Sequence, residues 1–189
     1  MFGRHFELNG QTMHIVEEIG QHMPGGFFIY KKTGDGDLLY ANHVVLNIYG
    51  CETVDEFREL TGYNFKGMVH PEDYDEISAS IEEQIAVSED YINCVEYRIV
   101  RRDGQVRWVD DHGHYTDTEA YGGICYVLIS DITEKHDKMV QEEQRTEMEH
   151  HRLMKEVQSA AELAELMASV SSLLSNMPAM SFSKDAETG

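Results

Sequence analysis

The first part of the chain alternates short apolar segments with turns rich in glycine, proline and aspartate. Apolar residues recur at helical spacing across residues 11–23, and Pro24 with the two glycines after it ends this helix. The apolar runs at 27–31 and 38–41 flank a turn that contains two glycines and two aspartates. This pattern predicts a short amphipathic helix followed by a β-hairpin.

Three helices are predicted between this hairpin and residue 87. Asn42 is a suitable N-cap for a short helix, and the segment Thr53-Val-Asp-Glu56 has the spacing of a capping box. A longer helix is expected over 70–87, because it opens with proline and two acidic residues, which suit a first helical turn.

Three long apolar–polar segments follow, and they predict antiparallel strands at 91–102, 105–115 and 121–130. Asp103-Gly104 between the first two is a strong hairpin signal. The order of two strands, several helices and three strands predicts an α+β fold.

The character of the chain changes after Asp131. Residues 132–175 contain neither proline nor glycine, and apolar or small residues recur at alternating steps of four and three. This seam consists of Leu153, Val157, Ala160, Ala164, Met167, Ser171 and Leu174. A second apolar stripe consists of Leu163, Leu166, Val170 and Leu173. The pattern is that of a coiled coil, and it predicts a homodimer through this helix.

The end of the chain resembles its beginning. The segment that starts at His14 aligns with the one that starts at Ala168, including a Met-Pro pair in each copy and a final Thr-Gly. This similarity predicts that residues 177–189 begin a second copy of the same module, cut off inside its first hairpin.

Composition limits the partners and the compartment. The 189 residues are 41% apolar, enough for a packed core, and carry a net charge of −20, which disfavours contact with nucleic acid or anionic membranes. No apolar run reaches the roughly 18 residues that span a bilayer. Cys51, Cys94 and Cys125 have no CxxC spacing and indicate reduced thiols. We therefore expect a cytoplasmic protein, or the cytoplasmic portion of a membrane receptor.

Four motifs together resemble PAS domains of the sensory-box subclass, which lie upstream of histidine kinases and diguanylate cyclases. They are Leu39-Tyr-Ala-Asn-His43, the segment 64–73 (NFKGMVHPED), the segment 101–109 (RRDGQVRWV), and Asp131-Ile132-Thr133. The resemblance implies a five-stranded antiparallel sheet with helices on one face, often with a ligand between them. It also implies that Asp131, Ile132 and Thr133 relay a signal to the following helix.

The resulting organisation has four parts. It comprises an N-terminal flanking helix (1–22), a PAS sensor domain (23–133), a signalling coiled-coil helix (134–176) and the start of a second PAS repeat (177–189).

The cofactor is unknown, but two are disfavoured. Flavin-binding light sensors of this family need a cysteine where Phe65 stands, and haem-binding members use a histidine inside the long helix, where only His70, before its proline, is present. Core packing is the first interpretation of Tyr97, Trp108 and Tyr126; the alternative is that they line a small-molecule pocket together with Asn42.

The histidine pairs indicate surface residues rather than a metal site. His112 and His114 share one face of a strand, whereas His150 and His151 diverge on a helix, and neither pair has a cysteine or acid in a recognised ligand spacing. The surroundings of His150 and His151 also differ from those of a kinase phosphoacceptor. No nucleophilic arrangement or phosphate-binding loop is present, so no enzyme activity is expected in this chain.

The favoured function is a sensory module that responds to a small ligand or another cue. The change would pass through a dimeric coiled coil to a downstream kinase or diguanylate cyclase. The alternative is a constitutive dimerisation module with a filled core and no ligand.

Overall fold

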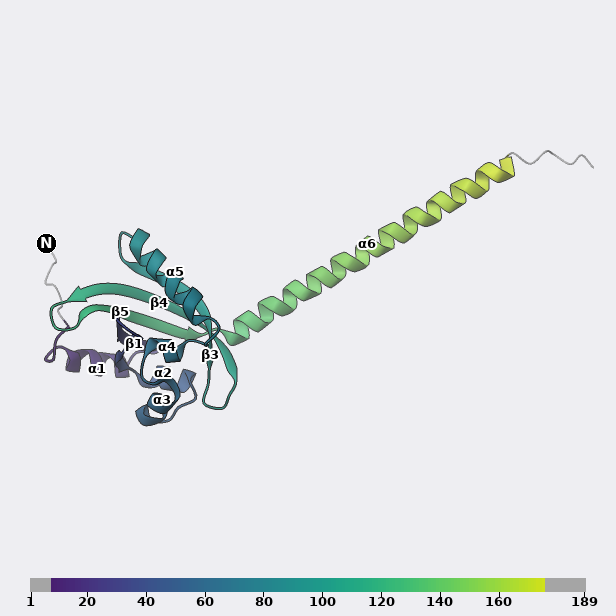
Figure 1. Cartoon of the computed structure of the whole chain (residues 1–189). Helices are drawn as coiled ribbons and strands as arrows, with labels where there is room; N and C mark the ends of the chain where they lie inside the picture. Colours follow the sequence, from purple (N-terminus) through teal and green to yellow (C-terminus); the bar gives the residue numbers. More distant parts are fainter. Residues whose placement is uncertain (1–7, 176–189) are drawn as a thin grey trace, which may run out of the picture. The chain divides into compact units, whose positions relative to one another are not determined.

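The computed structural model describes residues 8–175, with side chains up to residue 173. The chain divides into two compact units, Met1–Asp137 and Lys138–Gly189. The elements, shown in Figure 1, are α1 (Met13–Gln21), β1 (Gly26–Lys31), β2 (Leu38–Ala41), α2 (His43–Ile48), α3 (Val54–Thr61), α4 (Phe65–Met68), α5 (Tyr74–Val87), β3 (Ile92–Val100), β4 (Val106–Thr118), β5 (Gly122–Asp131) and α6 (Thr133–Ser175).

The five strands form one antiparallel sheet in the order β2-β1-β5-β4-β3. This confirms the predicted α+β fold and the predicted strands. The hairpin at Asp103-Gly104 sets the register of β3 and β4, with Val100 opposite Val106. Gly104 has a φ of 79°, a left-handed conformation that glycine adopts without steric cost.

One face of the sheet holds the larger core, which is packed against α2–α5. Every second residue of the strands points to this side, including Phe28, Tyr97 and Val109, each fully buried. The helices contribute apolar residues such as Val45 and Phe57 to the same cluster. Burial of this apolar surface is the main source of the stability of the fold.

The opposite face of the sheet is partly covered by α1. Val16 of α1 packs with Ile29, Tyr40 and Ile124 in a second, smaller core. Gly20 makes this contact possible, because a Cβ atom there would lie 2.6 Å from the hydroxyl oxygen of Tyr40. The helix predicted as a flanking element therefore packs directly on the sheet.

Backbone N–H and C=O groups on the exposed edge of β3 form hydrogen bonds with side chains from the helical layer. The Gln84 amide accepts a hydrogen bond from Cys94 N at 2.8 Å and donates one to Cys94 O at 3.1 Å. Asp73 accepts from Arg98 N at 3.0 Å and also pairs with the Arg98 guanidinium, whose hydrogen bonds hold the pKa of the Asp73 carboxyl below its ordinary value. These contacts block the edge against pairing with another strand.

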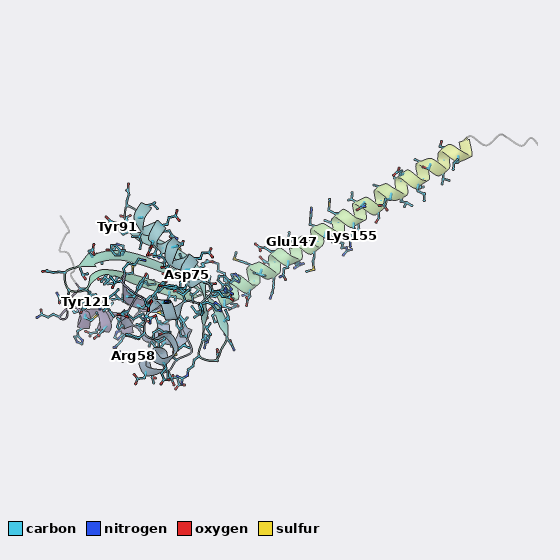
Figure 2. All side chains as sticks on the ribbon, in the orientation of Figure 1. Arg58, Asp75, Tyr91, Tyr121, Glu147 and Lys155 are labelled. Carbon is cyan, nitrogen blue, oxygen red and sulfur yellow. The ribbon has the colours of Figure 1, made fainter. Side chains whose placement is uncertain are left out.

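The second unit contains the remainder of α6. Its side chains project outward around the helix, as Figure 2 shows with Glu147 and Lys155 labelled. Apolar side chains on it are exposed, among them Leu153 (54%), Leu163 (59%) and Met167 (65%). The side chain of Leu174 and the predicted second repeat at 177–189 lie outside the described residues. Among the helices of residues 8–175, none has the length and apolar character needed to cross a membrane.

Candidate functional site: a buried carboxyl and the strand-to-helix joint

Aromatic side chains meet between the sheet and the helices, around Phe65. Asn64 caps α4 by accepting a hydrogen bond from Gly67 N at 2.8 Å, and this directs Phe65 into the core, where it is 5% exposed. Its ring stacks on Tyr30 with centroids 4.7 Å apart and meets Tyr97 edge-on at 6.1 Å. The ring of Phe65 thus fills this part of the core between Tyr30 and Tyr97.

Asp111 is a carboxyl group buried beside this cluster, on the helix-facing side of β4. It is 1% exposed, and its Oδ2 atom accepts a hydrogen bond from the Tyr97 hydroxyl at 2.9 Å. Its Oδ1 atom has no hydrogen-bond partner within the described part of the chain. Burial raises the pKa of Asp111 to about 7, and the hydrogen bond from Tyr97 acts in the opposite direction. Near neutral pH this carboxyl is therefore divided between its protonated and ionised forms.

Asn93 supplies a second unpaired oxygen on the same face. It is 2% exposed, and its Oδ1 atom also has no partner among residues 8–173. Its amide lies over Gly113, where a Cβ atom would come within 2.4 Å of Oδ1. Because Asn93 pairs with Gly113 and Val95 with Asp111, Asn93 and Asp111 are diagonal neighbours. A buried acceptor without a partner costs about 1–3 kcal/mol, so this site favours a hydrogen-bond donor.

The joint between β5 and α6 is built on Trp108 of β4. Ile132 N donates to Trp108 O at 2.9 Å, and Trp108 N donates to Thr133 Oγ1 at 2.9 Å. Asp131 Oδ1 accepts from Thr133 N at 2.9 Å and from Thr133 Oγ1 at 2.6 Å. The structure therefore brings the three predicted relay residues together, and Thr133 forms their side-chain contact with β4.

His136 extends this joint into the first turn of α6. Its ring stacks on Trp108 with centroids 4.2 Å apart and an interplanar angle of 14°. Its backbone N donates to Ile132 O at 2.8 Å. The sequence motif did not include His136 or assign this role to Trp108. Strand alternation could have placed Trp108 outside the core, because its neighbour Val109 faces inward.

Asn42 is a structural capping residue that also borders an open groove. Its Oδ1 atom accepts from Val45 N and Phe27 N, both at 3.1 Å, and its Nδ2 atom donates to Gly20 O and Gly25 O, both at 2.9 Å. These bonds tie α1, β1 and α2 together. The groove beside it is lined by residues of α1, β2, α2 and α3.

The four residues predicted to line a pocket are not gathered in one place. Tyr97 lies in the main core with Asp111. Trp108 is on the opposite face of the sheet, at the joint. Tyr126 packs against the smaller core under α1. Tyr97 is the one of the four that donates a hydrogen bond to Asp111, in the described part of the chain.

The antiparallel sheet in the order β2-β1-β5-β4-β3, with α2–α5 over one face, is the arrangement that the resemblance to PAS domains implies. Residues 38–129 match the family model described as PAS fold. The domain that contains them is a PAS domain. The matched model describes a fold and assigns no reaction to the chain. A search of curated proteins found no match.

Solved structures give the same result. The PAS domain of a protein from Colwellia psychrerythraea is 15% identical, with a TM-score of 0.52 over 65% of this chain and 98% of that chain. An RNA-binding Light-Oxygen-Voltage receptor is 18% identical, with a TM-score of 0.57 over 80% of this chain and 42% of that one. A LOV protein from Rhodobacter sphaeroides is 10% identical, with a TM-score of 0.53 over 66% and 69%. At these identities the similarity establishes the fold.

Proposed function

We propose that this chain is a sensory module that binds a small molecule in the core of its PAS domain and transmits the change through α6. The observation that carries the proposal is the pair of unpaired, buried oxygens of Asp111 and Asn93. A ligand with N–H or O–H groups would satisfy both and recover the energy that their burial costs. The ligand is therefore expected to be small and polar, with at least two donors.

The route of the signal follows β4. Asp111 and Trp108 are three residues apart on this strand, or about 10 Å at the usual rise of a strand. Trp108 is bonded to Ile132 and Thr133 through its backbone and stacks on His136 through its ring. A shift of β4 on ligand binding would thus reach the first turn of α6 directly.

Delivery of the signal requires a partner for α6. The helix exposes two apolar stripes over residues 153–173, which water disfavours and which a second copy of the same helix would cover. The proposed output is a kinase or a diguanylate cyclase, because the motifs resemble PAS domains that precede these enzymes. A parallel pair of α6 helices would carry the change to it.

Native mass spectrometry of the chain purified from cells tests the ligand. We expect an additional small-molecule mass in the wild type and in Tyr126→Phe, whose ring lies in the other core. The mass should be lost in Asn93→Leu and Asp111→Leu, with folding of each checked by circular dichroism. A chain that carries only its own mass would contradict ligand retention.

The aromatic packing around Phe65 favours a second candidate, a constitutive dimerisation module with a filled core. Rings of Tyr30, Phe65 and Tyr97 already occupy the space between sheet and helices. In that case a dimer would form with no bound small molecule, and Asp111→Leu would leave its properties unchanged apart from stability.

A further inference from the structure

A cysteine, an aspartate and a histidine meet on the face of the sheet that points away from α2–α5. Cys94 of β3 lies directly opposite His112 of β4, and Asp110 precedes His112 by two positions, so all three point to the same side. Cys94 and His112 are exposed and Asp110 is half-buried. Cys94 and His112 are far apart in the sequence, which is why their spacing along the chain matches no metal motif.

The donor atoms of this cluster have separations suited to one metal ion. Cys94 Sγ lies 3.8 Å from His112 Nε2 and 3.8 Å from Asp110 Oδ1, and His112 Nε2 lies 3.0 Å from Asp110 Oδ2. Two donors bound tetrahedrally to one zinc ion lie about 3.3–3.6 Å apart, given bonds of about 2.0–2.1 Å to nitrogen or oxygen and about 2.3 Å to sulfur. Asp110 faces Cys94 with one carboxylate oxygen and His112 with the other. One ligand atom from each of the three residues lies within 4.8 Å of the other two, so small side-chain movements would bring all three to one ion.

We propose that Cys94, Asp110 and His112 form a binding site for a divalent transition metal, with Zn²⁺ as the preferred ion. Thiolate, imidazole and carboxylate are the ligand types that zinc uses, and three protein ligands leave a fourth position open to solvent or to an incoming group. Uptake of the ion displaces the thiol proton of Cys94. The site is spatially separate from the ligand site proposed for the core, which lies on the other face of the sheet.

The backbone around the cluster is held in place. Asp110 and His112 belong to a strand that is paired on both sides. Cys94 lies on the edge strand, where both of its backbone polar groups are bonded to the Gln84 amide. Glu96, which is opposite Asp110 on the same face, adds negative charge that favours a cation. Rigid placement of ligands lowers the cost of ordering them around the ion.

Titration of the full chain with Co²⁺ tests the site, because tetrahedral Co²⁺ reports its ligands in the absorption spectrum. The protein is stripped with EDTA, desalted and kept reduced by a phosphine. We expect one equivalent to give visible d–d bands together with a thiolate-to-cobalt charge-transfer band, and Zn²⁺ to displace both. Cys94 is the exposed thiol, whereas Cys51 and Cys125 are buried.

Cys94→Ser should remove the charge-transfer band. His112→Gln should weaken binding by more than about 100-fold, since loss of an outer-shell partner alone costs about 10–100-fold. The matched control is His114→Gln, two positions further along the same face, which should bind as the wild type does. All four proteins are compared by circular dichroism, and the substitutions lie on the surface. Absence of the band in the folded wild type, or its persistence in Cys94→Ser, would overturn the proposal.

Discussion

Substitution of Asp111 by asparagine should remove a pH-dependent loss of stability. Burial raises the pKa of this carboxyl from 3.8 to about 7 in the folded chain. The folded state therefore binds the proton more tightly than the unfolded state does. The contribution of Asp111 to the free energy of unfolding is greatest below about pH 4 and falls as the pH rises to about 7.

The magnitude follows from the size of the shift. About three pKa units correspond to roughly 4 kcal/mol between the two extremes of pH. Between pH 5 and pH 8 the loss should be about 2–3 kcal/mol, because part of it has already occurred at pH 5. Asparagine has nearly the same shape and cannot ionise. The Asp111→Asn chain should therefore lose less stability than the wild type over this interval, by that amount.

Urea unfolding at pH 5 and pH 8, in buffer with EDTA and at one protein concentration, measures the difference. Trp108 is the single tryptophan of the chain and lies in the PAS domain, so its fluorescence reports the unfolding of this domain. Asp110 and His112 adjoin Asp111 on β4 and are present in both proteins. The phenols of Tyr30, Tyr49 and Tyr97 and the thiol of Cys125 also face it, and burial raises the pKa of each above its ordinary value, so these four groups stay neutral in both proteins between pH 5 and pH 8.

A second variant gives the opposite change. The Tyr97 hydroxyl donates to Asp111 Oδ2 and so stabilises the ionised form. Tyr97→Phe should raise the pKa of Asp111 further and enlarge the loss of stability between pH 5 and pH 8. Tyr126→Phe, in the other core, is the control and should behave as the wild type. Parallel stability profiles for the wild type and Asp111→Asn would refute the reasoning about this buried carboxyl.

Three further predictions concern the helix, the cofactor and the joint. The full chain should scatter light as a dimer and a chain ending at His136 as a monomer; a monomeric full chain at tens of micromolar would contradict the coiled coil. Purified protein should show neither a flavin nor a haem absorption band, because Phe65 stands where the resemblance places the cysteine of flavin-binding light sensors and α5 contains no histidine; a band that survives gel filtration would contradict this. In a chimera with a reporter kinase or cyclase after α6, Asp131→Ala should fix the output in one state while lowering stability by only about 1 kcal/mol; an unchanged response would make Asp131 an ordinary cap.

Capping and turn residues predicted the helices and strands well, because these residues act on their near neighbours along the chain. Asn42 and Thr53 cap their helices as expected, with side-chain oxygens that accept from Val45 N and Glu56 N. The Asp103-Gly104 hairpin forms where the turn residues place it. The short helix α4 was not predicted separately, since four residues carry too little periodicity to identify it.

The sites depend on contacts between distant segments, which apolar spacing alone does not specify. The pattern of α1 shows that it is amphipathic, but not that its apolar side covers Ile29 and Ile124. The pairing of Cys94 with His112 could have been found, because each lies six positions from the pair Val100 and Val106 next to the predicted turn. The inward position of Asp111 also follows from alternation after Val109, although only the structure establishes how completely it is buried.

The strand β4 connects the three features that these experiments address. Asp111 points into the core, while Trp108, Asp110 and His112 point to the other face, because neighbouring residues of a strand alternate between faces. A ligand that bonds Asp111 and a metal that binds Asp110 and His112 would therefore act on adjacent peptide units of one strand. Asp110, Asp111 and His112 all lie within four residues of Trp108, which contacts the first turn of α6. Substitutions at residues this close on one strand are expected to be energetically coupled. In a double-mutant cycle, the combined effect of Asp111→Asn and His112→Gln on the free energy of unfolding should therefore differ from the sum of their single effects in the presence of Zn²⁺. In EDTA this difference should be smaller.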